Sequence, residues 1–89
     1  MVIPSFALNG RVAVVTGGGQ GLGAASAMAL AGHGARVAVV DIDGDSADAV
    51  AASIGGNARA FRCDISSEAQ VAACIAEIQH LDTRRAFRG

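Results

Sequence analysis

A glycine-rich stretch, TGGGQGLG, occupies residues 16–23 and runs directly into an alanine-rich segment. The backbone N–H groups in the first turn of a helix have no partners within the helix, and the helix dipole adds partial positive charge there. A phosphate can bind at such a terminus if no Cβ atom blocks its approach. Glycine permits that approach and also the positive φ angles of a tight turn. The stretch therefore predicts a phosphate-binding turn.

The spacing of these glycines favours a dinucleotide as the ligand. Gly19, Gly21 and Ala24 fit the G-x-G-x-x-G/A pattern, and Asp41 follows Gly21 by 20 positions. A carboxylate at that distance accepts hydrogen bonds from the ribose hydroxyls of the adenosine half. Glycine-rich turns also occur without a ligand, but here the pattern lies between a predicted strand and a predicted helix. A P-loop is excluded, because its motif needs a lysine and the chain has none.

Among nicotinamide dinucleotides, the charges favour NAD over NADP. The carboxylate of Asp41 would repel a 2′-phosphate, which usually has an arginine nearby. The next residue is Ile42, and the glycine stretch contains no basic residue. Arg11 and Arg36 stand at the opposite ends of their predicted strands. We therefore expect NAD as the cofactor.

Three short apolar segments are predicted strands, each followed by one predicted helix. The strands are expected at residues 11–15, 36–40 and 58–63, and the helices at residues 22–33, 44–54 and 67–80. A β-α-β-α-β-α order implies parallel strands with right-handed crossovers, hence an α/β fold. We expect the first two strands to be buried on both faces, because they are apolar throughout.

Local signals mark where the predicted helices begin and end. Gly34 is placed to end the first helix, and the glycine pair at residues 55–56 is placed to end the second. Ser67 and Gln70 form a capping-box pattern at the start of the third. The helix faces expected to be apolar comprise Ala24, Ala27, Met28 and Ala31 in the first helix, Ala47, Val50, Ala51 and Ile54 in the second, and Val71, Cys74, Ile75 and Ile78 in the third.

With these motifs in place, the chain resembles the short-chain dehydrogenase/reductase family over about residues 6–78. FALNGRVAVVTGGGQGLG is similar to the family's opening, GARVAVVDID to its second strand, and CDISSEAQVAACIAEI to the segment after its third strand. The resemblance implies a Rossmann fold, partial here, with three parallel strands in the order 3-2-1. It also implies an NAD(P) cofactor and hydride transfer to or from an alcohol or ketone.

The resemblance assigns cofactor-binding roles to residues around the glycine stretch and the strand ends. Leu22 would offer its backbone N–H to the pyrophosphate, and the Thr16 hydroxyl would brace the turn. Asp64, with Ile65 beside it, would contact the adenine amine; equally, Asp64 is a loop carboxylate near a helix start. The full predicted set is Thr16, Gly17, Gly19, Gly21, Leu22, Gly23, Asp41, Ile42, Asp64 and Ile65.

The resemblance stops before the family's catalytic half. Nothing after His80 is similar to the family's N-A-G strand, and the chain contains no tyrosine and no lysine, so no catalytic residue is assigned. We divide the chain into a partial dinucleotide-binding domain, residues 1–80, and an irregular arginine-rich tail, residues 81–89. The leading hypothesis is an oxidoreductase fragment, truncated or frameshifted and inactive alone. The alternative is a stand-alone NAD-binding or partner-docking module.

Composition limits the remaining functions. The chain has 89 residues, 52% hydrophobic and 17% charged, with a net charge of -1, which argues against nucleic-acid binding. No segment is long and apolar enough for a membrane span, and we do not expect the amino-terminal segment to be a signal peptide. Cys63 and Cys74 lack metal or redox spacing and are expected to be buried thiols in a cytoplasmic protein; no metal site is predicted.

Without a fourth strand, the first predicted strand becomes a sheet edge. In the doubly wound order this strand is normally central. An unpaired apolar edge pairs readily with other chains. We expect a marginally stable fold with a surface for self-association at this edge.

Overall fold

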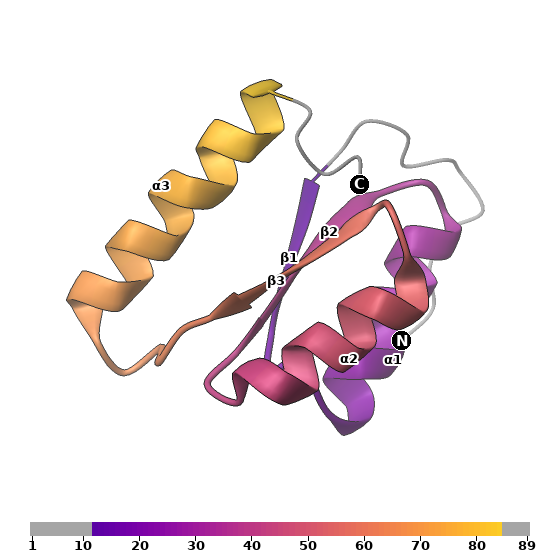
Figure 1. Cartoon of the computed structure of the whole chain (residues 1–89), viewed down its shortest axis with the longest axis horizontal. Coiled ribbons are helices and arrows are strands. Elements are labelled where there is room, and N and C mark those ends of the chain that lie inside the picture. The colour runs from indigo at the N-terminus through magenta and orange to yellow at the C-terminus, as the bar shows by residue number, and fades with distance from the viewer. Residues whose placement is uncertain (1–11, 85–89) are drawn as a thin grey trace.

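The computed structural model describes the backbone of residues 12–84 and the side chains of residues 12–79. The chain alternates strands and helices as predicted (Figure 1). The elements are β1 (Val12–Thr16), α1 (Gly21–Gly32), β2 (Arg36–Asp41), α2 (Gly44–Ile54), β3 (Ala58–Arg62) and α3 (Glu68–Arg84). Arg11, predicted to open the first strand, and residues 85–89 lie outside the described residues. Of the irregular tail predicted at residues 81–89, residues 81–84 are helical instead.

The three strands form one parallel sheet in the order β1-β2-β3, which confirms the predicted 3-2-1 arrangement. In the register, Val12 is opposite Arg36 and Asp41 is opposite Arg62. The central strand β2 is buried from Val37 to Asp41. Because the strands are parallel, their carboxyl ends share one edge of the sheet, to which β1 brings the glycine turn and β2 brings Asp41.

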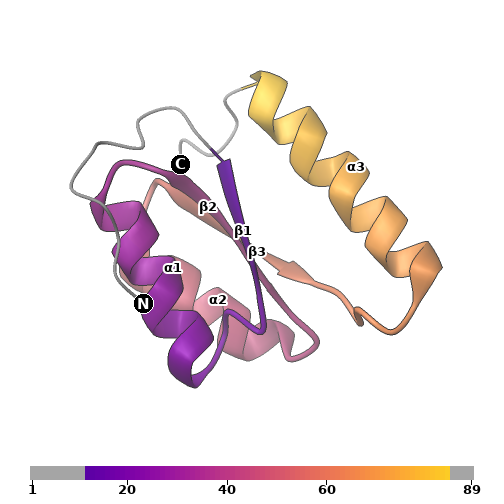
Figure 2. The same cartoon turned by 180° about the vertical axis from the view of Figure 1, so that it is seen from behind.

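Helices cover both faces of the sheet. Helices α1 and α2 lie together on one face and α3 lies alone on the other, as both views show (Figures 1 and 2). Val37 and Val39 point into the cluster under α1 and α2, which also contains Ala27, Ala47 and Val50. The second cluster, under α3, contains Ala38, Val40, Phe61, Cys63 and Ile78. The two-residue alternation of β2 thus supplies two separate apolar cores.

Most helix ends follow the local signals. Helix α2 has the predicted bounds, and Gly55 ends it at φ 98°. Gly34, after α1, has φ 94°. The predicted apolar face of α1 is only partly buried: Ala27 is fully buried, but Met28 is 46% exposed at the rim of the α1–α2 layer.

Helix α3 differs from the prediction at both ends. It continues to Arg84, four residues beyond the predicted end at His80, whose side chain lies outside the described residues. The capping box is only half formed. The Gln70 N–H donates to the Ser67 hydroxyl at 3.3 Å, but the Gln70 side-chain oxygen accepts from the N–H of Asp64 rather than from Ser67.

Strand β1 is the edge of the described sheet and is less buried than its apolar sequence suggested. Every residue of β1 is at least partly exposed, and Val14 is 46% exposed. The expectation of a strand buried on both faces is therefore wrong for β1 and correct for β2. Burial follows from position in the sheet, because β2 has a neighbour on each side.

Candidate nucleotide-binding site

The glycine turn joins the end of β1 to the start of α1. The N–H of Gly18 donates to the carbonyl oxygen of Val40 at 3.1 Å, which ties the turn to β2. Gly17 and Gly21 have φ angles of 66° and 53°, in the left-handed region that other residues adopt only at a cost. A Cβ atom at either position would meet no neighbour within 4 Å. Glycine is needed at these two positions for conformation.

Gly19 and Gly23 are needed for a different reason, which is close packing. A Cβ on Gly23 would lie 2.2 Å from the carbonyl oxygen of Gly17. A Cβ on Gly19 would lie 2.8 Å from the Cβ of Ser46 and 2.9 Å from Oδ2 of Asp41. The absence of a side chain at Gly23 lets α1 begin directly against the turn. The absence of a side chain at Gly19 lets the turn contact both α2 and Asp41.

The amino terminus of α1 leaves its backbone donors uncapped. Gln20 occupies the N-cap position without a side-chain capping hydrogen bond, and the first turn contains no acidic residue. By contrast, α2 is capped by Asp43 and α3 by Ser67. The N–H groups at the start of α1, including that of Leu22, are therefore suited to an external anion such as a pyrophosphate.

Asp41 lies against the glycine turn, as the sequence predicted. Its Oδ2 accepts a hydrogen bond from the N–H of Gly19 at 3.0 Å, and its Oδ1 accepts one from the N–H of Asp43 at 3.0 Å. The residue is only 9% exposed. A carboxylate can accept about four hydrogen bonds, so each oxygen keeps capacity for one more donor. The two backbone bonds fix the side chain and leave acceptor sites for a diol.

A small cavity connects Asp41 with the loop that follows β3. Its volume is about 160 Å³, and it is lined by Gly17, Val40, Asp41, Ile42, Cys63, Asp64 and Ile65. Five of these seven residues belong to the predicted cofactor set. The fold thus gathers residues from three loops at the carboxyl edge of the sheet, where open α/β sheets bind ligands.

Asp64 organises the loop between β3 and α3. Its Oδ1 accepts hydrogen bonds from the hydroxyl of Ser66 at 2.6 Å and from the Ser66 N–H at 2.9 Å, and these bonds lower the pKa of the Asp64 carboxyl. Asp64 therefore has the structural role that the loop interpretation predicted, and it also lines the cavity. Its contact with adenine stays a prediction.

The other predicted residues surround the same turn. Thr16 ends β1 with an exposed side chain. Within residues 12–84 its hydroxyl makes no hydrogen bond, so its bracing role stays a prediction. Leu22, Ile42 and Ile65 are 79%, 58% and 63% exposed. Exposed apolar side chains around this cavity suit contacts with the flat faces of a bound base.

Arg62 is a basic residue at this edge that the sequence analysis missed. It lies opposite Asp41 in the β2–β3 register, and its Nε donates to the carbonyl oxygen of Ile42 at 3.3 Å. The sequence could have indicated this position, because Arg62 is the last residue of β3. In a parallel sheet, that residue lies beside the end of β2. Arg36 begins β2 at the opposite edge, as predicted.

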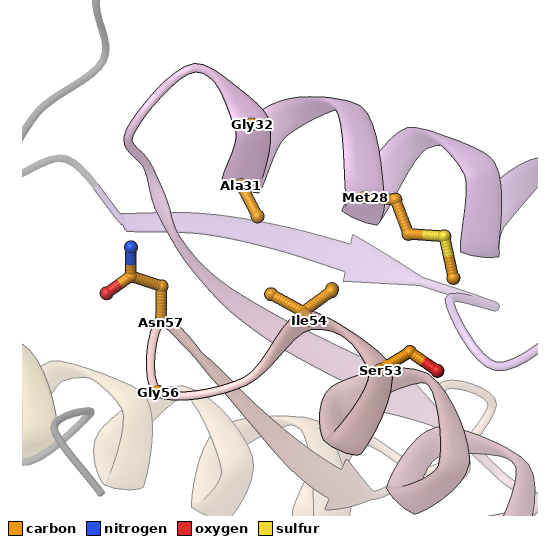
Figure 3. A pocket seen from close by; sticks show the side chains of 7 residues that line it. All are labelled: Met28, Ala31, Gly32, Ser53, Ile54, Gly56 and Asn57. Atoms are coloured by element: carbon orange, nitrogen blue, oxygen red, sulfur yellow. The ribbon is translucent and has the colours of Figure 1, made fainter.

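A larger hollow of the described surface lies away from the glycine turn and Asp41. It has a volume of about 530 Å³ and is lined by Met28, Ala31, Gly32, Ser53, Ile54, Gly56 and Asn57, between the carboxyl ends of α1 and α2 (Figure 3). It contains no ionisable side chain and lies at the amino edge of the sheet. We assign the site to the smaller cavity because hydrogen-bonding groups converge there.

Residues 12–84 contain neither a candidate metal centre nor a membrane-spanning helix. No group of three or more His, Cys, Asp or Glu side chains is arranged to hold a metal ion in this range. None of the helices in the same range has the length and hydrophobicity needed to cross a bilayer.

The chain is similar in sequence to a known family. A family model described as short chain dehydrogenase matches residues 11–83. The 2,5-dichloro-2,5-cyclohexadiene-1,4-diol dehydrogenase of Sphingobium indicum is 47% identical over 70 residues, which are 79% of this chain and 28% of that protein.

Solved structures show the same relationship. A 3-ketoacyl-(acyl-carrier-protein) reductase from Brucella melitensis, complexed with NADH, has a TM-score of 0.84 and 40% identity, covering 86% of this chain and 32% of the reductase. A hydroxysteroid dehydrogenase from Escherichia coli has a TM-score of 0.73 and 44% identity, covering 75% of this chain and 29% of that chain. This chain therefore spans about a third or less of the length of these relatives.

Proposed function

Since the chain belongs to the short-chain dehydrogenase family, with its NAD(P)-binding Rossmann-type fold, we propose that the glycine turn and Asp41 bind NAD. One observation carries this proposal: the N–H of Gly19 donates to the Asp41 carboxylate at 3.0 Å. The Asp41 carboxylate, which can accept hydrogen bonds from ribose hydroxyls, therefore lies directly beside the uncapped amino terminus of α1. The pyrophosphate would lie on the N–H groups of Gly21 and Leu22, and the adenosine ribose on Asp41.

We prefer NAD to NADP because of the charge on Asp41. A 2′-phosphate on the same ribose would approach a carboxylate that is 9% exposed and little screened by water. The guanidinium of Arg62 opposes this preference, because it stands at the end of the neighbouring strand. The hydrogen bond from Arg62 Nε to Ile42 directs that side chain to the β2–α2 turn. We therefore assign the dominant effect to Asp41.

The reaction proposed for the intact enzyme is hydride transfer between NAD and an alcohol or ketone, and this chain supplies the cofactor-binding part. By itself it is expected to be inactive. It has no tyrosine to act as acid or base and no lysine to assist it. Residues 1–80 form the proposed cofactor domain, and a cytoplasmic location stays a prediction.

A second candidate function is a stand-alone binding module that acts through the open edge of the sheet. Val12 and Val14 of β1 and Ile75 and Ile78 of α3 line a groove of about 270 Å³ beside this edge. Exposed apolar side chains next to unpaired strand groups favour pairing with another chain. Self-association through β1 is the simplest form of this function.

Calorimetric titration with NAD and NADP tests the cofactor proposal. Asp41→Asn removes the charge while keeping the side-chain shape, and we expect NAD affinity to fall at least about tenfold, since hydrogen bonds to charged groups contribute roughly 1.5–3 kcal/mol. The ratio of NAD to NADP affinity should fall as well, because the repulsion of the 2′-phosphate is removed.

The matched control is Asp45→Asn, which removes the same charge from an exposed position in the first turn of α2. Its NAD affinity should equal that of the unmodified chain. Equal NAD affinity in Asp41→Asn and the unmodified chain would remove Asp41 from the site. Far-UV circular dichroism of each variant separates loss of binding from loss of fold.

A further inference from the structure

The two cysteines of the chain are too far apart in sequence for a Cys-x-x-Cys redox motif, but they lie at the same apolar cluster in the structure. Cys63 follows β3 and is 3% exposed, within the apolar cluster under α3. Cys74, in the second turn of α3, packs against the same cluster. Burial, with Cys63 as the next contributor, raises the pKa of the Cys74 thiol, and both thiols are free. Both cysteines thus lie at the apolar contact between the end of β3 and α3.

Each thiol also borders a separate hollow. Cys74 is half-buried and lines a hollow of about 460 Å³ together with Arg59, Arg62, Gln70 and Glu77. Cys63 lines the small cavity of the candidate nucleotide site. A reagent from solution can therefore reach Cys74 first. The two guanidinium groups favour an anionic reagent, and Glu77 partly offsets them.

We propose that Cys63 and Cys74 form a dithiol site that low-molecular-weight disulfides, such as oxidised glutathione, convert into an intramolecular disulfide. The Cys74 thiolate attacks one sulfur of the reagent, forms a mixed disulfide and releases one glutathione thiolate. Cys63, after loss of its proton, attacks the Cys74 sulfur and releases the second glutathione. The protein loses two protons and two electrons, and the reagent is reduced to two thiols.

The new bond would fix the loop that carries Asp64 and Ile65. This loop leaves Cys63, turns around the hydrogen bonds that Asp64 accepts from Ser66, and enters α3. A disulfide from Cys63 to Cys74 closes it into a ring and attaches α3 covalently to the sheet. Loop closure removes conformations from the unfolded chain, so the oxidised protein should melt on the order of 10 °C higher.

Peptide mapping tests this proposal without reference to nucleotide binding. The full chain is incubated at low concentration with oxidised glutathione, and its mass is measured without reduction. We expect a monomer lighter by two hydrogen atoms, with no free thiol and no bound glutathione. Trypsin leaves both cysteines in one peptide, residues 63–84, and cleavage after Glu68 should give two pieces joined by the disulfide.

Controls separate proximity in the fold from simple reactivity. Cys63→Ala should leave the accessible Cys74 thiol, which takes up glutathione, whereas Cys74→Ala should leave the buried Cys63 thiol largely unmodified. Neither variant can form the intramolecular bond. The same oxidation in urea should give a lower yield of the ring, because unfolding separates the thiols. Glutathione on both cysteines, a disulfide-linked dimer, an unmodified chain, or an equal yield in urea would each overturn the proposal. Because the mapping uses the unmodified chain, its result stands even if a variant does not fold.

Discussion

Replacing Gly23 with alanine tests whether α1 packs against the glycine turn as closely as the structure shows. The added Cβ would lie 2.2 Å from the carbonyl oxygen and 2.8 Å from the carbonyl carbon of Gly17. Both are backbone atoms, so the clash can be relieved only by moving the turn or the helix. Overpacking of this kind costs about 1–3 kcal/mol, and a contact this short belongs at the upper end.

Helix propensity acts in the opposite direction. Alanine is favoured over glycine within a helix by about 1 kcal/mol. The net loss of unfolding free energy is therefore about 2 kcal/mol, which lowers Tm by roughly 8–15 °C in a domain of this size. The turn should also open, so NAD binding should weaken in the same variant.

Gly32→Ala in the same helix is the matched control. Gly32 is exposed, and a Cβ there would meet nothing within 4 Å. Because Gly32 is the last residue of α1, the gain from alanine should lie between zero and about 1 kcal/mol. Thermal and urea unfolding, followed by far-UV circular dichroism, would measure both variants. If Gly23→Ala is as stable as Gly32→Ala, α1 does not pack against the glycine turn as closely as the structure shows.

Two further predictions concern the cap of α2 and the edge of the sheet. Asp43→Ala should lower Tm, because Asp43 accepts hydrogen bonds from the Ser46 hydroxyl at 2.8 Å and the Ser46 N–H at 3.2 Å, whereas Asp43→Asn should retain most of the cap. These bonds lower the pKa of Asp43, so its stabilising effect is present above the ordinary aspartate pKa of about 3.9 and is lost as pH falls through its lower folded value. The Tm difference between the unmodified chain and Asp43→Ala should therefore shrink in acid; a constant difference down to the lowest pH would contradict this origin. Val14→Lys should reduce self-association measured by sedimentation velocity, because a charge on an edge strand blocks pairing. Ala52→Lys, which adds the same charge to an exposed position of α2, should leave self-association unchanged, and equal effects of both lysines would point to general charge repulsion instead.

The sequence by itself determined the elements and most of their ends. Gly34 and Gly55 end helices because each adopts a positive φ that residues with a Cβ atom rarely adopt. The alternation of strand and helix fixed the parallel sheet, and the spacing from Gly21 to Asp41 placed a carboxylate near the turn. These signals depend on residues close together in the chain or on a fixed topology, so they can be interpreted without coordinates.

Only the tertiary structure decided which groups meet across elements. The Gly19–Asp41 hydrogen bond joins residues 22 positions apart, and the pairing of Asp41 with Arg62 depends on strand register. The extension of α3 to Arg84 and the neighbouring thiols of Cys63 and Cys74 likewise were not predicted. Contacts of this kind depend on how helices and strands pack against one another, and local propensity carries no information about packing at that distance.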